Sequence, residues 1–242
     1  TMNMVEDGLI AIEDPVSKYI PEFANMSIID EESGAITAAK NQMTVQDLLT
    51  HESGLIYGTF DPQSVLGQQY LNAGSVRFDI TALELAKTLA ALPLRFEPGT
   101  KWHYSRSTDV LGAVIEVAAG KSLDLLLKER IFDPLGMDET TFYVDASKAE
   151  RLANPIHGDM ADPLDVQPML SGGGGLHSTT EDYVRFASML LNGGEYKGAR
   201  IISQNTLDAM NQKFIGDDIN RDAFFFGPRG DWGLGFHLQP IP

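Results

Sequence analysis

The chain has 242 residues, 43% of them hydrophobic, which is enough for the core of one large domain or two small ones. Its 34 acidic and 18 basic residues give a formal net charge of −16, which argues against nucleic acid and against an anionic membrane surface as partners. The absence of cysteine excludes disulfides, a cysteine nucleophile and thiolate metal sites. No run of 18 uncharged apolar residues occurs, so no membrane span is expected, and a small neutral substrate fits this chain best.

The first part of the chain predicts short helical pieces. Residues 1–7 are typical of the last turns of a helix that ends at Gly8, and two prolines divide residues 9–23 into short segments. Thr81 and Glu84 have the spacing of a capping box, which predicts a helix directly after them.

The middle of the chain predicts a buried helix. Residues 109–120, DVLGAVIEVAAG, are apolar almost all round, which indicates a central helix that ends at Gly120. Residues 122–132 predict a second helix, closed by Pro134.

The last third predicts two more helices and a strand. Ser178 and Glu181 form a second capping-box pattern, before a helix over residues 182–191. Its apolar residues recur on one face, which we expect to be buried: Tyr183, Phe186, Ala187, Leu190 and Leu191. Residues 202–214 predict another helix, 216–231 a surface loop, and the alternating residues 232–239 a strand.

Several common catalytic and binding motifs are absent. There is no G-x-S-x-G elbow, and the His51-Glu52 pair lacks the second histidine of H-E-x-x-H. The glycine run SGGGG at 171–175 lacks the Lys-Ser/Thr of a phosphate loop, and residues 218–222, DINRD, lack the Gly and Glu of a calcium loop. We therefore expect no metal and no cofactor.

Tyr104 is the strongest candidate for a chemical role. It stands in KWHYSRSTDVLG, between a Pro-Gly turn and the predicted buried helix, and a rigid helix start can hold a reacting group in place. A tyrosine at such a position can equally be structural, with its ring packed and its hydroxyl bonded. It can act as a base only if a nearby cation or donor lowers its pKa, normally about 10.

Four blocks of sequence, in order and covering most of the chain, resemble the serine β-lactamase-related hydrolases. These are class C β-lactamases, penicillin-binding DD-peptidases and, most closely, family VIII carboxylesterases. The blocks are LIAIEDPVSKYIPEF, MTVQDLLTHESGL, FEPGTKWHYSRSTDVLG with its continuation to IFDPLGMDETTF, and SGGGGLHSTTEDYVRFASMLLNGG. The resemblance implies an α+β fold, with a helical subdomain and an α/β/α antiparallel-sheet domain. Residues 1–242 would be a mainly α part of that domain.

The resemblance also implies a mechanism. A serine in an S-x-x-K motif attacks an ester or amide carbonyl, and the motif lysine shares proton transfer with a tyrosine, which Tyr104 matches. No serine of this chain has a lysine three residues later; the nearest look-alike runs from Thr37 to Lys40. The third motif of the family is a Lys, His or Trp, then Ser, Thr or Gly, then Gly, on a strand beside the serine. It is also absent from the place where it is expected, after residues 233–238. We therefore expect an internal fragment whose nucleophile and lysine lie outside the chain, and which is inactive by itself.

The resemblance nominates further site residues. The third position of the family's Y-x-N motif holds Arg106, which cannot accept a hydrogen bond, and this favours a carboxylesterase of short-chain esters over a β-lactamase or DD-peptidase. Tyr57 and Gly58 are expected near the acyl pocket, and Gly173 and Gly174 near the cleft. An acyltransferase and a catalytically dead binding scaffold are the alternatives. The oligomeric state is left open.

His51 and Ser53 look like a catalytic pair in the sequence. We interpret His51 instead as a structural residue at the end of a helix, where the helix dipole favours a cation.

Overall fold

The structure is a computed structural model that describes residues 1–153, 162–216, 219 and 230–239. The DINRD segment, apart from Ile219, and most of the predicted loop at 216–231 lie outside these residues.

The described residues are mainly helical, as the sequence predicts for this part of an α+β fold. The α-helices are α1 (Met2–Glu6), α2 (Val45–Thr50), α3 (Val65–Asn72), α4 (Ala82–Ala90), α5 (Ser107–Ala119), α6 (Leu123–Leu127), α7 (Asp133–Leu135), α8 (Thr180–Leu191) and α9 (Gln204–Met210). Short 3₁₀ turns cover Val16–Lys18, Pro21–Asn25 and Ala146–Arg151, and a π-helical turn covers Lys128–Phe132. The strands form three antiparallel hairpins: β1 (Ser27–Ile29) with β2 (Ile36–Ala38), β3 (Glu195–Tyr196) with β4 (Ala199–Arg200), and β5 (Asp231–Trp232) with β6 (His237–Leu238).

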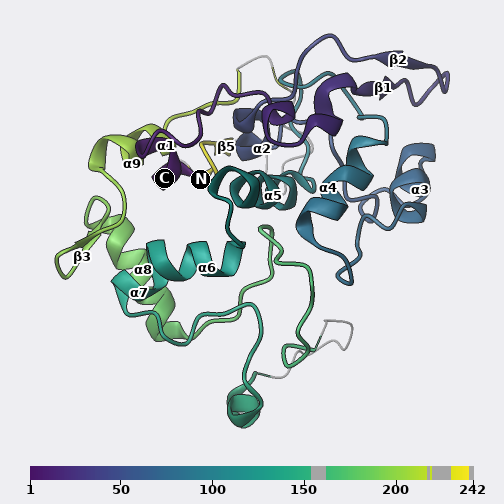
Figure 1. Cartoon of the computed structure of the whole chain (residues 1–242). Helices are drawn as coiled ribbons and strands as arrows, with labels where there is room; N and C mark the ends of the chain where they lie inside the picture. The colour runs from purple at the N-terminus through teal and green to yellow at the C-terminus, as the bar shows by residue number, and fades with distance from the viewer. Residues whose placement is uncertain (154–161, 217–218, 220–229, 240–242) are drawn as a thin grey trace.

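Helix α5 lies at the centre of the fold and packs against α2 and α4 (Figure 1). Val110, Ala113 and Val114 of α5 are almost completely buried, as the nearly uniform apolar sequence predicts. The helix ends where Gly120 adopts a left-handed conformation, with φ of 62°, so the predicted end is confirmed. The last turns are less enclosed, with Val117 40% exposed, so the predicted burial holds for the first half of the helix. Burial there gives the residues of the first turn a fixed position.

The capping predictions succeed at one helix and are wrong at another. Thr81 accepts a hydrogen bond from the backbone N–H of Glu84, and the Glu84 carboxylate accepts in return, so α4 begins with the predicted capping box. Helix α8 is capped one residue later than predicted, because the side chain of Thr179 rather than Ser178 accepts from the backbone of Asp182.

Pro134 does not close the helix before it. It lies in α7, which follows the π turn without a break, so the helical segment continues past the proline. The chain leaves this segment at Gly136, which adopts a left-handed conformation with φ of 66°.

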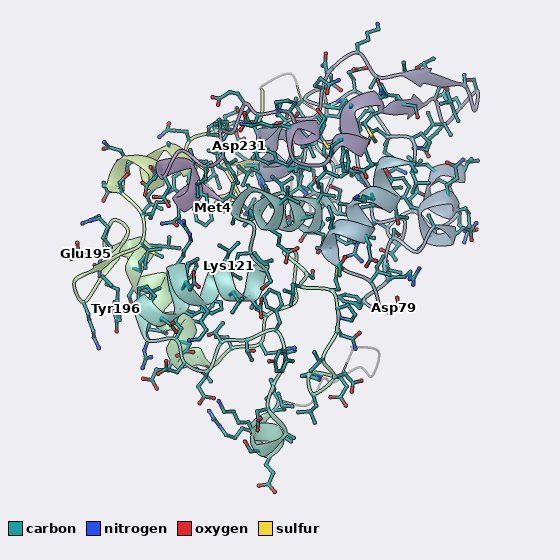
Figure 2. The ribbon with its side chains drawn as sticks, in the orientation of Figure 1. Met4, Asp79, Lys121, Glu195, Tyr196 and Asp231 are labelled. Atoms are coloured by element: carbon teal, nitrogen blue, oxygen red, sulfur yellow. The ribbon has the colours of Figure 1, made fainter. Side chains whose placement is uncertain are left out.

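The apolar face predicted for α8 is only partly buried. Phe186 and Leu190 pack against the core, but Tyr183 is 65% exposed and Leu191 is 87% exposed. The expectation of a buried face is therefore wrong for these two residues. The hairpin that follows α8 lies far from the α3–α4 side of the molecule; Figure 2 labels Glu195 of this hairpin at one edge.

Residues 232–239 form a hairpin end rather than the single strand expected. Gly235, with φ of 82°, turns the chain so that Trp232 pairs with His237. The Trp232 ring is buried and its Nε1–H donates to the carbonyl oxygen of Leu49, at 3.0 Å, which joins this hairpin to α2.

Candidate active site

Tyr104 lies in the extended segment that leads into α5. The helix begins at Ser107, with Arg106 as its N-cap. Just before Tyr104, the backbone N–H of His103 donates to the carbonyl oxygen of His51, at 3.0 Å. The segment is thus fixed at one end by a buried helix and at the other by a backbone bond to the end of α2.

Aromatic rings surround the half-buried side chain of Tyr104. Its ring centroid lies 4.6 Å from that of His51 and 5.8 Å from that of Tyr57, which is stacked at an interplanar angle of 23°. Phe60 adds a third ring at 6.3 Å. Tilted and offset packing of this kind restricts rotation of the ring, so the direction of the Tyr104 hydroxyl is set by its neighbours.

His51 packs against the ring of Tyr104 at the end of α2. It caps the end of α2 in a left-handed conformation, with φ of 60°, and its Nδ1 accepts a hydrogen bond from the backbone N–H of Ser105, at 3.3 Å. Burial, and then the nearby His103, lower the pKa of His51 to about 3. The structural role at a helix end agrees with the prediction, but the physical reason is different: the ring is neutral, so no charge–dipole attraction operates.

Three serines close to Tyr104 form a buried hydroxyl network. The Oγ of Ser107 lies 2.7 Å from the Oγ of both Ser53 and Ser105, and all three residues are completely buried. The Oγ of Ser53 also accepts from the backbone N–H of Leu55. These hydroxyl groups hydrogen-bond to one another inside the fold, as buried polar groups generally do.

Tyr57 and Gly58 come from the loop after α2, and the Tyr57 ring stacks on that of Tyr104. Burial, and then the nearby carboxylate of Asp109, raise the pKa of the Tyr57 hydroxyl well above its usual value, so this phenol stays protonated. Gly58 is buried with φ of 86°, and a Cβ there would lie 2.9 Å from the carbonyl oxygen of Gly67. Gly58 therefore serves the close approach of the loop to α3.

Arg106 turns inward rather than toward open space. Its side chain is 5% exposed and its Nη1 donates to Oδ2 of Asp109, at 2.9 Å, while the Asp109 side chain is 1% exposed. The guanidinium carbon also lies 4.6 Å from the centre of the Tyr57 ring, a cation–π contact, and 5.9 Å from that of Phe78.

The glycine run 171–175 packs on the first turn of α5. The Ser171 hydroxyl donates to Oδ1 of Asp109 at 2.5 Å, and the backbone N–H of Gly173 donates to the same atom at 3.3 Å. A Cβ at Gly172 would lie 2.5 Å from the carbonyl oxygen of Thr108, whereas a Cβ at Gly174 would meet nothing within 4 Å. The close approach of the two backbones explains why residue 172 is a glycine, whereas Gly174 borders open space.

Sequence reasoning did not single out Asp109, which joins Arg106 to this loop. A signal was present, because an arginine and an aspartate three residues apart at a helix start are neighbours on one face. The contacts to Ser171 and Gly173 join residues 62 and 64 positions apart in sequence, and spacing gives no hint of them.

A cavity of about 850 Å³ lies near this site without including Tyr104. It is lined by the β1–β2 hairpin, Arg95, Trp102 and His103. Arg95 is already bonded to Glu31 and Asp61 there. Tyr104 and the glycine run are not among its lining residues, so we do not assign this cavity as the candidate active site despite its size.

The residues that the structure describes contain no group of three or more His, Cys, Asp or Glu side chains placed to hold a metal ion. No helix in the described ranges is long and apolar enough to cross a membrane.

The fold of the described residues is similar to that of solved structures over almost the whole chain. The model of the Beta-lactamase family matches residues 1–242, and the chain belongs to this family.

Known relatives and a solved structure resemble the chain over most of its length. Protein Rv1367c of Mycobacterium tuberculosis is 32% identical over 252 residues, which covers 98% of this chain and 61% of the relative. Esterase EstB of Burkholderia gladioli is 33% identical over 164 residues, which covers 67% of this chain and 39% of the relative. The solved structure of "EstCE1, a hydrolase with promiscuous acyltransferase activity" aligns with a TM-score of 0.78 at 25% identity, covering 99% of this chain and 65% of that one. The chain thus spans less than two thirds of the length of the two curated relatives.

Proposed function

We propose that the protein containing this chain is a serine hydrolase that cleaves short-chain carboxylic esters through an acyl-enzyme, with Tyr104 as a proton-transfer group. The observation that carries the proposal is the ring of Tyr104 held against His51 and Tyr57 at the start of a buried helix. Such fixed placement is what a general acid or base requires.

In this mechanism the nucleophilic serine and its lysine come from an S-x-x-K motif outside residues 1–242. Tyr104 and that lysine relay the serine proton to the leaving alcohol, which leaves as the acyl group becomes bonded to the serine oxygen. Water then attacks the acyl carbon, the bond between that carbon and the serine oxygen breaks to release the acid, and a proton from the water is transferred to the serine oxygen. The Tyr57 ring and the open edge of the loop at Gly173 and Gly174 would border the acyl group.

The side chain of Arg106 supports esters over lactams. In β-lactamases and DD-peptidases the asparagine at this motif position contacts the substrate amide, whereas Arg106 has only donors and its Nη1 is bonded to Asp109. The similarity to EstB, which is named an esterase, supports the same choice.

The test uses the full-length protein and compares a p-nitrophenyl short-chain ester with a chromogenic cephalosporin. We expect the ester to be cleaved much faster, and Tyr104→Phe to lower kcat/KM by about 10²–10⁴-fold, the usual contribution of a general acid or base. The unfolding temperature of the variant checks that its fold is retained. Faster cleavage of the cephalosporin would reverse the choice of substrate class, and full activity of Tyr104→Phe would remove the proposed role.

Acyl transfer is a second candidate, because the similar protein EstCE1 is described as a hydrolase with promiscuous acyltransferase activity. Transfer and hydrolysis share one acyl-enzyme and differ in the acceptor. Adding an alcohol or amine acceptor to the ester assay distinguishes them, since a transferase forms the new ester or amide at the expense of free acid. A binding scaffold would neither cleave the ester nor be acylated by it.

A further inference from the structure

Arg106 is too enclosed to be explained as a substrate contact. Its side chain is 5% exposed, and its Nε is buried without a hydrogen-bond partner among the described residues. An ion removed from water to this degree is stabilised only by close partners, which here are the Asp109 carboxylate and the face of the Tyr57 ring.

Asp109 extends the same arrangement to the glycine loop. One of its oxygens accepts from Arg106, and the other accepts from the Ser171 hydroxyl and from the backbone N–H of Gly173. One buried ion pair therefore touches three separate segments: the loop that carries Tyr57, the first turn of α5, and residues 171–175. Tyr57 stacks on Tyr104, and the first turn of α5 follows Tyr104 directly in the chain. The 171–175 loop packs on that first turn through Asp109.

We propose that the Arg106–Asp109 ion pair holds Tyr57 against Tyr104 and the 171–175 loop on the first turn of α5, and that Arg106 acts through these contacts without touching the substrate. Arg106 is then a positioning residue. The inference deepens the proposed function and rests on it, because the consequence for the reaction assumes that Tyr104 transfers a proton.

The route from Arg106 to Tyr104 is a continuous series of contacts. The guanidinium lies on the Tyr57 ring, and the Tyr57 ring stacks on that of Tyr104. Removing the guanidinium leaves the Tyr57 ring free to shift into its place, and the Tyr104 ring then loses one of the surfaces that fix its direction. A small misplacement of a reacting group slows the chemical step by a large factor.

Helix α8 provides a matched control. There Arg185 contacts Asp182 three residues earlier, at 3.5 Å, and the Asp182 carboxylate also accepts from a loop, through the backbone N–H of Glu139 and the hydroxyl of Thr140. This pair has the same three-residue separation, in the reverse order, and the same link from a helix start to a loop, but it lies on a different helix from the one that follows Tyr104.

The experiment measures acylation of full-length protein by p-nitrophenyl butyrate in single-turnover stopped flow. This separates the acylation rate constant from the apparent dissociation constant of the ester. We expect Arg106→Met and Asp109→Leu each to lower the rate constant about tenfold or more while the dissociation constant changes less than about threefold, since interactions made only in the transition state affect the rate. The double variant should react faster than either single variant, because it leaves no unpaired buried charge. Arg185→Met should match the wild type.

A second comparison tests whether Arg106 acts through Tyr57. In a Tyr57→Leu background the ring is already missing, so adding Arg106→Met should lower the rate constant by a smaller factor than it does in the wild type. If Arg106→Met lowers the acylation rate constant by the same factor in the Tyr57→Leu background as in the wild type, the proposal is overturned. It is also overturned by a dissociation constant raised more than about tenfold by Arg106→Met with an unchanged rate constant, the result expected of a direct substrate contact.

Failure of the proposed function gives a different pattern. If wild-type full-length protein is neither acylated by the ester nor labelled by a fluorophosphonate, the proposed hydrolase function is wrong. Hydrogen exchange then tests separately whether the ion pair supports the 171–175 loop. Asp109→Leu should then speed exchange of a peptide covering residues 171–175, whereas Arg185→Met should not. Unchanged exchange in Asp109→Leu would overturn the ion pair as the support of the loop.

Discussion

The substitution Gly172→Ala tests how the glycine run is held on α5. The added Cβ would lie 2.5 Å from the carbonyl oxygen of Thr108, which belongs to the first turn of a buried helix and cannot rotate away. The loop must move instead, and such overpacking costs about 1–3 kcal/mol. The same movement weakens the bond from the Gly173 N–H to Asp109, worth about 0.5–1.5 kcal/mol.

Gly174→Ala is the matched control. A Cβ at this position meets nothing within 4 Å, and the backbone φ there is outside the left-handed range. Alanine should be neutral or stabilise the protein by about 0.4–1 kcal/mol, because it restricts the unfolded chain.

Thermal unfolding of the full-length variants, followed by circular dichroism, measures the difference. The expected loss for Gly172→Ala is about 1.5–4.5 kcal/mol, the sum of the overpacking and the weakened bond. At about 2–4 °C per kcal/mol this lowers the unfolding temperature by about 3–18 °C, while Gly174→Ala stays at or above the wild type. Equal unfolding temperatures for the two variants would show that the loop does not pack on α5 as described.

Two further predictions concern His51 and the buried serines. The pKa of His51 is about 3 in the folded chain and about 6.5 when unfolded, so below pH 6.5 the unfolded state binds a proton that the folded state does not, and stability falls as pH falls, by up to about 1.4 kcal/mol per pH unit. Urea unfolding at several pH values between about 4 and 7 measures how the free energy of unfolding depends on pH. That dependence should be weaker for His51→Asn, a substitution that keeps a residue tolerant of the left-handed conformation. An unchanged dependence on pH would contradict the neutral buried ring. The 242-residue chain should not be labelled by a fluorophosphonate at Ser53, Ser105 or Ser107, because all three are completely buried. Stoichiometric labelling mapped by mass spectrometry to any of them would refute this.

Local signals in the sequence were sufficient where a short segment determines its own conformation. The capping box of Thr81 and Glu84 and the left-handed end of α5 at Gly120 both depend on residues within one turn of the helix terminus. The cap of α8 was misassigned by one residue because Ser178 and Thr179 have the same side-chain chemistry, and only the backbone geometry distinguishes them. The α8 face was misjudged because periodicity shows which residues share a face but not what covers it.

The net charge argued against nucleic acid and anionic membrane surfaces as partners, and the order of four motifs indicated the family and drew attention to Tyr104. What only the tertiary structure decided is how the site is held: His51 is neutral and packed on Tyr104, three serines bond to one another, and Arg106 is paired with Asp109. Burial determines whether a histidine is charged, whether a hydroxyl is accessible and whether an arginine can reach a ligand. Burial comes from segments far apart in the chain that pack together, and no short stretch of sequence contains that information.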